Sequence, residues 1–210
     1  DGPSTVDLQN KFNVFDLTKV VDDPELLPIV FQTLVNFTLQ MGMVNIEDPK
    51  VLLFDECWKF ISTNSQVASF VEYAFRSLAK FNFASFAITQ SMEEFLSAPC
   101  SAAILENTSN ILIFRQNSAQ SVASAAGELQ MNEREVAAVQ ALKSINGKYS
   151  QFLHIERTRN GKTSTLCYVI PTPMSYAICT TNPRDIKKRN DLAISEGNLI
   201  AGIKKFAELY

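Results

Sequence analysis

Two adjacent acidic residues, Asp55 and Glu56, follow the short apolar run Lys50–Phe54 (KVLLF). A run of this kind is typical of a strand buried on both faces of a parallel sheet. Ligands of such sheets bind beyond the carboxyl ends of the strands. There, Asp55 can hold Mg²⁺ through its water shell, and Glu56 can polarise a water molecule for in-line attack on a γ-phosphate. The pair therefore suits nucleotide hydrolysis, and a pair that only caps the next helix is the alternative interpretation.

Two further apolar runs also end in polar residues. Ala84–Thr89 (ASFAIT) precedes Gln90, and Ile111–Phe114 (ILIF) precedes Arg115 and Gln116. A glutamine at the end of a neighbouring strand can contact both the attacking water and the phosphate. We therefore expect the three strand ends to meet at one rim of a sheet.

Helical patterns alternate with these runs. Apolar residues recur at helical spacing over Pro24–Met41 and Gln66–Lys80, and a short helical stretch is broken at Pro99. Lys11–Leu17 (KFNVFDL) alternates like an additional strand. The order of elements predicts an α/β fold, with a mostly parallel sheet flanked by helices.

The pattern changes beyond residue 116. A helix is predicted from Asn132 to about Lys143, with Glu135 at its third helical position. Tyr149–Arg157 and Thr163–Ile170 alternate, and an Asn-Gly pair joins them, which predicts a β-hairpin.

The end of the chain predicts one more strand at Tyr176–Thr180 and then a helical tail. We therefore predict one domain in two parts. Residues 1–116 hold the polar strand ends, and residues 117–210 add a helix, the hairpin and the helical tail.

Composition narrows the function further. The net charge of −3 provides no overall basic field for nucleic acid. The single histidine, His154, lies in an alternating run, which favours a structural role. No apolar run approaches the ~18 residues of a membrane span, and no signal peptide is evident. The cysteines lack zinc-site spacing and fit free thiols of a reducing cytosol: Cys57, Cys100, Cys167 and Cys179.

Three segments, in this order and spacing, resemble the TraC-type conjugative-transfer ATPases, the motor ATPases of type IV secretion systems: VLLFDECWKF (Val51–Phe60), AITQSMEEFL (Ala87–Leu96) and ILENTSNILIFRQ (Ile104–Gln116). The opening DGPSTVDLQNKFNVFDL and the later GKYSQFLHIE are similar too, so the resemblance covers nearly the whole chain. It implies a RecA-like fold related to the HerA and FtsK motors. It also implies hexamers that hydrolyse ATP with Mg²⁺ to drive pilus assembly or substrate export, including DNA transfer.

The resemblance assigns roles to the polar strand ends. Asp55 would be the Walker B aspartate and the Mg²⁺ residue, Glu56 the catalytic glutamate, and Gln90 the strand-end sensor. Trp58 follows the acid pair, as an aromatic residue commonly does in this family, and packing explains it better than chemistry.

The chain departs from the family pattern before the sensor strand. Ala79 stands where an arginine is expected, although Lys80 is kept. The candidates for contact with phosphate, within a subunit or across a subunit boundary, are therefore Arg76, Lys80 and Arg115. Each also fits a surface ion pair.

A phosphate-binding (Walker A) loop is not found in the 210 residues. The only Gly-Lys-Thr-Ser run is Gly161–Ser164, at the predicted hairpin turn, and Glu156 stands where the loop needs its first glycine. We therefore expect the chain to be the C-terminal portion of a larger ATPase, inactive without its N-terminal part.

The resemblance also implies partners: other subunits of the hexamer, components of the secretion machinery, and the N-terminal part of the same protein. It implies a place in the bacterial cytoplasm at the inner membrane, with peripheral membrane association. Contact with nucleic acid would rest on the resemblance alone. Two alternatives are a catalytically degenerate RecA-like protein-interaction module and a small metal enzyme that adds Asp16 to the acid pair.

Overall fold

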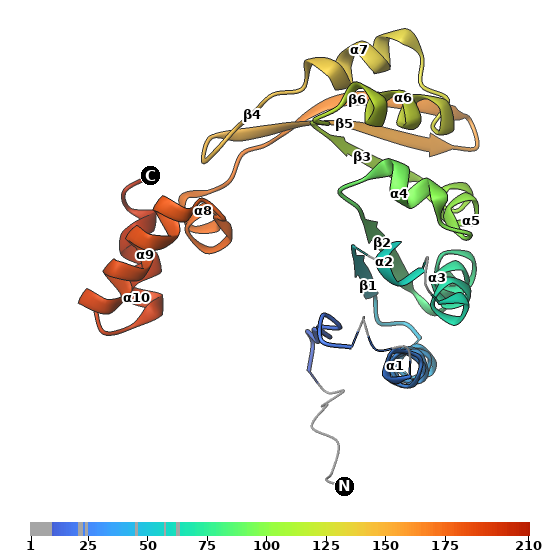
Figure 1. Ribbon diagram of the computed structural model, residues 1–210, viewed down its shortest axis with the longest axis horizontal. Helices are drawn as coiled ribbons and strands as arrows, with labels where there is room; N and C mark the ends of the chain where they lie inside the picture. The colour runs from blue at the N-terminus through green and yellow to red at the C-terminus, as the bar shows by residue number, and fades with distance from the viewer. Residues whose placement is uncertain (1–9, 21–22, 24, 45, 57, 62–63) are drawn as a thin grey trace, which may run out of the picture. The chain divides into compact units, whose positions relative to one another are not determined.

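The chain forms two compact units, residues 1–108 and 109–210. A computed structural model describes residues 10–20, 23, 25–44, 46–56, 58–61 and 64–210 (Figure 1). Pro24 and Cys57 lie outside the described residues.

The first unit is built around two parallel strands. β1 (Lys50–Asp55) pairs with β2 (Phe83–Ile88), with Lys50 opposite Phe83 and Asp55 opposite Ile88. The other elements are helical: α1 (Leu26–Met43), α2 (Trp58–Ile61), α3 (Ser65–Ser77), the 3₁₀ helix η1 (Leu78–Phe81), α4 (Met92–Ser97) and α5 (Ser101–Glu106). The predicted parallel strands with helices between them are confirmed, and α4 and α5 lie on either side of Pro99.

Helices cover one face of this sheet. Phe54 of β1 points to α3, where its ring lies 6.3 Å from that of Phe70, and Phe70 in turn lies 5.7 Å from Phe31 of α1. On the opposite face Val51 is 68% exposed and Leu53 is 54% exposed. The expectation that this strand is buried on both faces is therefore wrong for the described residues, because their helices pack on one side only.

Two sequence expectations near the N-terminus are wrong. Residues 11–17 form no strand, and Asp16 instead accepts hydrogen bonds from the amide and hydroxyl of Thr18 in a turn. The apolar alternation in this segment lacks a partner strand among the described residues. An apolar stretch of membrane-spanning length is present after all, since α1 is long and apolar enough by length and composition. Core helices of folded domains share this length and composition, and Phe31 of α1 packs in the core of the first unit.

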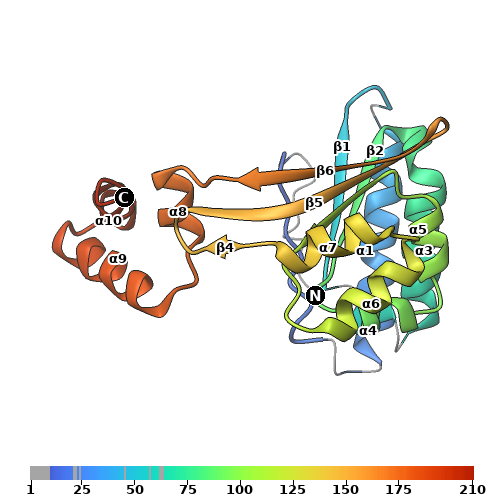
Figure 2. The same cartoon turned by 90° about the horizontal axis from the view of Figure 1, so that it is seen from above.

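The second unit holds an antiparallel sheet. Its strands are β3 (Asn110–Phe114), β4 (Ser144–Ile145), β5 (Tyr149–Thr158) and β6 (Gly161–Val169), and β5 pairs with each of the other three. The long β5–β6 hairpin is clear in Figure 2. Its helices are α6 (Ala119–Glu128), α7 (Glu133–Ala141), α8 (Pro173–Cys179), α9 (Pro183–Ser195) and α10 (Leu199–Ala207).

β3 differs from its prediction. It was expected as a further parallel strand, yet it pairs antiparallel with β5, with Leu112 opposite His154. Because of this pairing β3 groups with the second unit, and the chain divides after residue 108 rather than after residue 116.

Helix-start signals explain the end of the chain. The strand predicted at Tyr176–Thr180 is wrong, because α8 occupies this segment. The hydroxyl of Thr172 accepts a hydrogen bond from the amide of Ser175, and Pro173 lies in the first turn. Both features favour the start of a helix. The predicted helical tail is confirmed as α9 and α10.

Candidate active site

The two strand ends of the first unit coincide at one edge of the sheet. Asp55 lies opposite Ile88, and the amide of Glu56 donates a hydrogen bond of 3.0 Å to the carbonyl of Ile88. Gln90 follows two residues after Ile88, and neighbouring strands are about 4.8 Å apart. Asp55 and Glu56 therefore lie at the carboxyl end of β1, beside the end of β2 from which Thr89 and Gln90 follow.

Glu56 has an unusual backbone conformation. Its φ of 52° lies in the left-handed region. A residue other than glycine enters this region at a cost of about 1–2 kcal/mol. Residues held in such conformations cluster at functional sites. The left-handed residue follows Asp55 directly at the end of β1, where Asp55 is exposed and Glu56 is half-buried.

The chain after β2 is held by short-range hydrogen bonds. The hydroxyl of Thr89 donates to the carbonyl of Ser91 at 2.8 Å, and the hydroxyl of Ser91 accepts the amide of Glu94 at the start of α4. Gln90 lies between these two residues and is exposed, as is Asp55, whereas Glu56 is half-buried. The acid pair and the glutamine thus stand on defined turns.

The residue types at this edge fit a magnesium ion. Within the described ranges, no group of three His, Cys, Asp or Glu side chains could hold a metal. Mg²⁺ commonly keeps several waters and binds through one or two carboxylates plus substrate phosphates. Asp55, exposed at the strand end, matches that preference.

Arg76 and Lys80 lie at the other end of the same sheet. Arg76, in the last turn of α3, pairs with Glu72 at 2.8 Å, and the ammonium of Lys80 lies 5.0 Å from the centre of the Phe81 ring. Both precede β2, whose length separates them from Gln90 by roughly 20 Å. Within one chain these two cations therefore do not reach the acid pair.

Arg115 belongs to the second unit. It is exposed after β3, and the side-chain amide of Gln116 donates to the carbonyl of Phe114 at 3.0 Å. Because β3 does not pair with β2, the expected rim of three strand ends is reduced to two.

The run Gly161–Ser164 has a structural role. It lies in β6, where the ammonium of Lys162 contacts a carboxylate oxygen of Glu135 at 2.7 Å and the carbonyl of Gln130 at 2.8 Å. Ser164 donates to the other oxygen of Glu135. This geometry agrees with rejecting the run as a phosphate-binding loop.

Glu135 is the buried centre of that cluster. It is 5% exposed, and it also accepts the amide of Asn132 at 2.8 Å in the capping box of α7. Burial raises the pKa of Glu135, but the hydrogen bonds from Lys162, Ser164 and Asn132 outweigh burial and lower the pKa below its usual value. The sequence indicated the cap of this helix but not the partners from β6.

Within the part of the chain that the structure describes, His154 and three of the four cysteines show no catalytic arrangement. His154 lies in β5 with its Nε2 2.9 Å from the side-chain oxygen of Asn110. Cys100 is buried, Cys167 is half-buried and Cys179 is exposed, and all three are free thiols. Trp58 is buried and packs in the first unit, as expected from the sequence.

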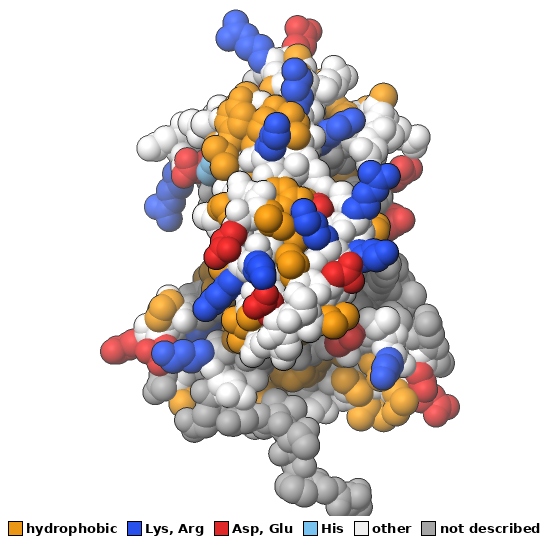
Figure 3. Space-filling model, turned by 90° about the vertical axis from the view of Figure 1, so that its left-hand side faces the viewer, with side chains coloured by type: hydrophobic (Ala, Val, Ile, Leu, Met, Phe, Trp, Pro, Cys, Tyr) orange, Lys and Arg blue, Asp and Glu red, His pale blue; other side chains and the backbone are white. Residues whose placement is uncertain are grey.

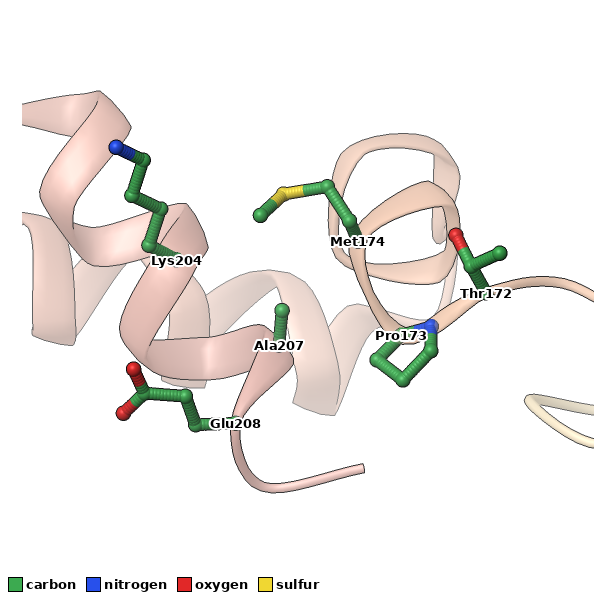
Figure 4. Close-up of a pocket in the computed structure, with 6 residues that line it drawn as sticks. All are labelled: Thr172, Pro173, Met174, Lys204, Ala207 and Glu208. Atoms are coloured by element: carbon green, nitrogen blue, oxygen red, sulfur yellow. The ribbon is translucent and has the colours of Figure 1, made fainter.

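A surface hollow of about 470 Å³ lies in the second unit, between α8 and α10 (Figure 4). Met174 points across it toward α10. Its lining contains none of the predicted site residues: Thr172, Pro173, Met174, Lys204, Ala207 and Glu208.

Comparison with known proteins identifies the family. The model of the TraG P-loop domain matches residues 4–209, nearly the whole chain. The chain belongs to the TraG P-loop domain family. No individually curated protein matches this TraG P-loop domain sequence.

A solved structure shows that this TraG P-loop domain has a known fold. The chain is similar in structure to VirB4 of Thermoanaerobacter pseudethanolicus, with a TM-score of 0.55 and 16% sequence identity. The similarity covers 81% of this chain and 41% of the VirB4 chain. The chain thus spans about two-fifths of the VirB4 chain. The RecA-like α/β fold and the resemblance to conjugative-transfer and type IV secretion ATPases are confirmed at the level of the family.

Proposed function

We propose that this TraG P-loop domain supplies the acid pair and the sensor of an ATP-hydrolysing site in a conjugation or type IV secretion motor. The observation that carries the proposal is the shared edge of β1 and β2. The proposal is supported by Asp55 at the end of β1 opposite Ile88 of β2, by Gln90 two residues after Ile88, and by the left-handed conformation of Glu56.

Each residue has a distinct proposed role. Asp55 orients the waters around Mg²⁺, which when bound neutralises charge on the phosphate oxygens. Glu56 accepts a hydrogen bond from the attacking water and holds it in line with the γ-phosphate. Gln90 donates its side-chain amide to the γ-phosphate or to that water, so that its position depends on which nucleotide is bound.

Anchoring of the triphosphate needs groups from outside these 210 residues. The sequence has no GxxxxGK[ST] loop, and Lys162 is engaged with Glu135. Asp55 and Glu56 alone would repel a triphosphate. We therefore propose that the phosphate-binding loop comes from the N-terminal part of the same polypeptide, and that this chain alone does not hydrolyse ATP.

The assembly and its work are also proposals. We infer a hexamer in which Arg76 or Lys80 approaches the acid pair of a neighbouring subunit, because neither reaches it within one chain. Arg115 is the remaining candidate for this contact. The motor would act at the cytoplasmic face of the inner membrane, bound peripherally with the secretion machinery, to drive pilus assembly or substrate transfer.

The test is steady-state hydrolysis by a polypeptide that carries both the phosphate-binding loop and this chain. Glu56→Gln should lower kcat by roughly 10²- to 10⁴-fold while ATP binding is kept, because only the step that activates water is lost. Asp55→Asn should instead raise the Mg²⁺ concentration needed for hydrolysis. Glu47→Gln, an exposed glutamate in the loop before β1, is the matched control and should leave kcat unchanged.

Two results would overturn the proposal. Unchanged hydrolysis by the Glu56→Gln variant would show that Glu56 does not activate the attacking water, whereas no hydrolysis by the wild-type loop-containing polypeptide would favour the alternative of a catalytically degenerate protein-interaction module. Hydrolysis by the 210-residue chain alone, above that of an Asp55→Asn/Glu56→Gln variant, would contradict the need for an external phosphate-binding loop.

A further inference from the structure

Thr89, the residue before Gln90, makes two hydrogen bonds to the residue after Gln90. The hydroxyl of Thr89 donates to the carbonyl of Ser91 at 2.8 Å and accepts a hydrogen bond from the amide of Ser91 at 3.2 Å. Both bonds span Gln90, so one half-buried side chain fixes the backbone on either side of that residue. We call these two hydrogen bonds the Thr89 clasp.

Both ends of the Thr89 clasp are anchored in the first unit. On the strand side, the carbonyl of Ile88 accepts a hydrogen bond of 3.0 Å from the amide of Glu56, which ties the end of β2 to the end of β1. On the helix side, the carbonyl of Ser91 also accepts a hydrogen bond of 3.1 Å from the amide of Phe95. Phe95 is 5% exposed and packs in the core. The backbone at Gln90 is therefore held between the acid pair and the core.

The side chain of Gln90, in contrast, is exposed. Within the described residues it makes no hydrogen bond. A side-chain amide of this kind on a fixed backbone suits a contact that forms only when a ligand is bound, because a backbone already in place loses little conformational entropy on binding.

Short-range contacts of this kind matter because the chain has no strong field of one sign. Its net charge is −3, and acidic and basic side chains are interspersed on the face of the molecule in Figure 3. Exposed charges of both signs largely screen one another beyond about 10 Å. The placement of a phosphate therefore depends on groups that meet it directly.

We propose that Thr89 is a positioning residue for ATP hydrolysis: its hydroxyl holds Gln90 where the side-chain amide reaches the attacking water or the γ-phosphate. The inference rests on the role proposed above for Gln90 and names the residue on which that role depends. Thr89 acts only through the backbone of Gln90. Loss of its hydroxyl releases the link between β2 and α4, and a small displacement of a positioned group slows a reaction.

The test is steady-state ATP hydrolysis by the loop-containing polypeptide. Thr89→Val removes the hydroxyl at nearly constant shape and should lower kcat about tenfold, the equivalent of one ordinary hydrogen bond. The KM for ATP should stay within about twofold of the wild type, because the lost contact acts on the transition state. Thr89→Ser keeps the hydroxyl and should restore kcat.

A double variant shows whether Thr89 acts through Gln90. Gln90→Ala should lower kcat by roughly 10²-fold, as expected for loss of one hydrogen-bond donor to the reacting group. Once the amide of Gln90 is gone, the clasp has nothing to position. Thr89→Val/Gln90→Ala should therefore be no slower than Gln90→Ala alone.

Thr108→Val is the matched control. Thr108 is another half-buried threonine of the first unit, and its hydroxyl donates to the carbonyl of Ile104 at 2.7 Å. Thr108→Val should lower thermal stability about as much as Thr89→Val does. It should leave kcat unchanged, because this hydroxyl braces the end of α5 and not the turn that carries Gln90.

Each contrary outcome overturns a defined part. If Gln90→Ala slows hydrolysis and Thr89→Val does not, Thr89 does not position Gln90, while the proposed function stands. Equal slowing by Thr108→Val would reduce the effect of Thr89 to a loss of stability. A double variant slower than Gln90→Ala by the full Thr89→Val factor would show that Thr89 acts independently of Gln90. If the wild type hydrolyses ATP and neither Gln90→Ala nor Thr89→Val changes kcat, the role proposed for Gln90 fails and the inference fails with it.

Discussion

Replacing Lys162 tests whether the Gly-Lys-Thr-Ser run is structural. In Lys162→Met the side chain keeps its aliphatic length, but Glu135 loses its ion pair at 2.7 Å and the carbonyl of Gln130 loses its 2.8 Å hydrogen bond. Glu135 is 5% exposed, so water replaces the lost partner poorly. We expect the second unit to lose stability.

The magnitude follows from these contacts. A hydrogen bond to a charged group contributes about 1.5–3 kcal/mol. Ser164 and the amide of Asn132 remain on Glu135, and the Lys162 side chain is 27% exposed, so solvent offsets part of the loss. We therefore expect the free energy of unfolding to fall by about 2 kcal/mol.

The measurement is urea unfolding followed by far-UV circular dichroism. Lys148→Met, at an exposed lysine in the turn before β5, is the matched control and should change the free energy by less than about 0.5 kcal/mol. A double-mutant cycle with Glu135→Gln should give a coupling of about 1–3 kcal/mol. The structural interpretation is refuted if Lys162→Met leaves stability unchanged but abolishes ATP binding by the loop-containing polypeptide.

Three further outcomes follow from the second unit. Gly202→Ala should destabilise the α9–α10 pair by about 1–3 kcal/mol, because the new Cβ meets backbone atoms of Ala193, while Gly127→Ala, with open space around it, should be neutral or stabilising by up to about 1 kcal/mol in thermal unfolding. The pKa of Glu135 is lower in the folded state than its unfolded value of 4.5, so the carboxylate stabilises the fold at pH values above 4.5. This stabilisation is lost as the pH falls through the folded-state pKa, and Glu135→Gln should flatten that part of the pH–stability curve. The hydrogen bond to Asp185 helps raise the pKa of Tyr210 to about 12. The protonated phenol therefore contributes its full stabilisation below pH 10, and this stabilisation is lost as the pH rises through 12. Tyr210→Phe should remove this transition from an ultraviolet tyrosinate titration.

Local signals predicted the elements that carry their own geometry. Asn132 and Glu135 form the expected capping box, and the Asn-Gly pair at Asn160 joins β5 and β6 in a two-stranded hairpin. Such signals involve hydrogen bonds or backbone angles among residues close in sequence, so a single stretch of sequence contains the information needed.

Long-range pairing could not be read in the same way. The alternating segment at residues 11–17 looks like a strand, but strands need partners and none of the described residues supplies one. The apolar run of β3 was recognised, yet its partner around His154 lies some forty residues later, and the run itself does not specify it. At Tyr176 the cap at Thr172 outweighs local strand propensity.

The candidate site shows the same division. Polar residues after two apolar runs were enough to predict that the ends of these two strands lie at one edge, and β1 and β2 do pair in parallel with Asp55 opposite Ile88. Local sequence patterns did not predict the left-handed backbone of Glu56 or the distance of Arg76 and Lys80 from this edge, because both depend on three-dimensional packing.

The most direct test asks whether Glu56 and Gln90 act on the same water and phosphate. Measure kcat for ATP hydrolysis in Glu56→Gln, Gln90→Ala and the double variant of the loop-containing polypeptide. If the strand ends form one site, the double variant should be no more than a few-fold slower than Glu56→Gln alone, because residues that act as a unit are not additive. Rate losses that multiply fully in the double variant would show that the two residues act independently and would contradict a shared site.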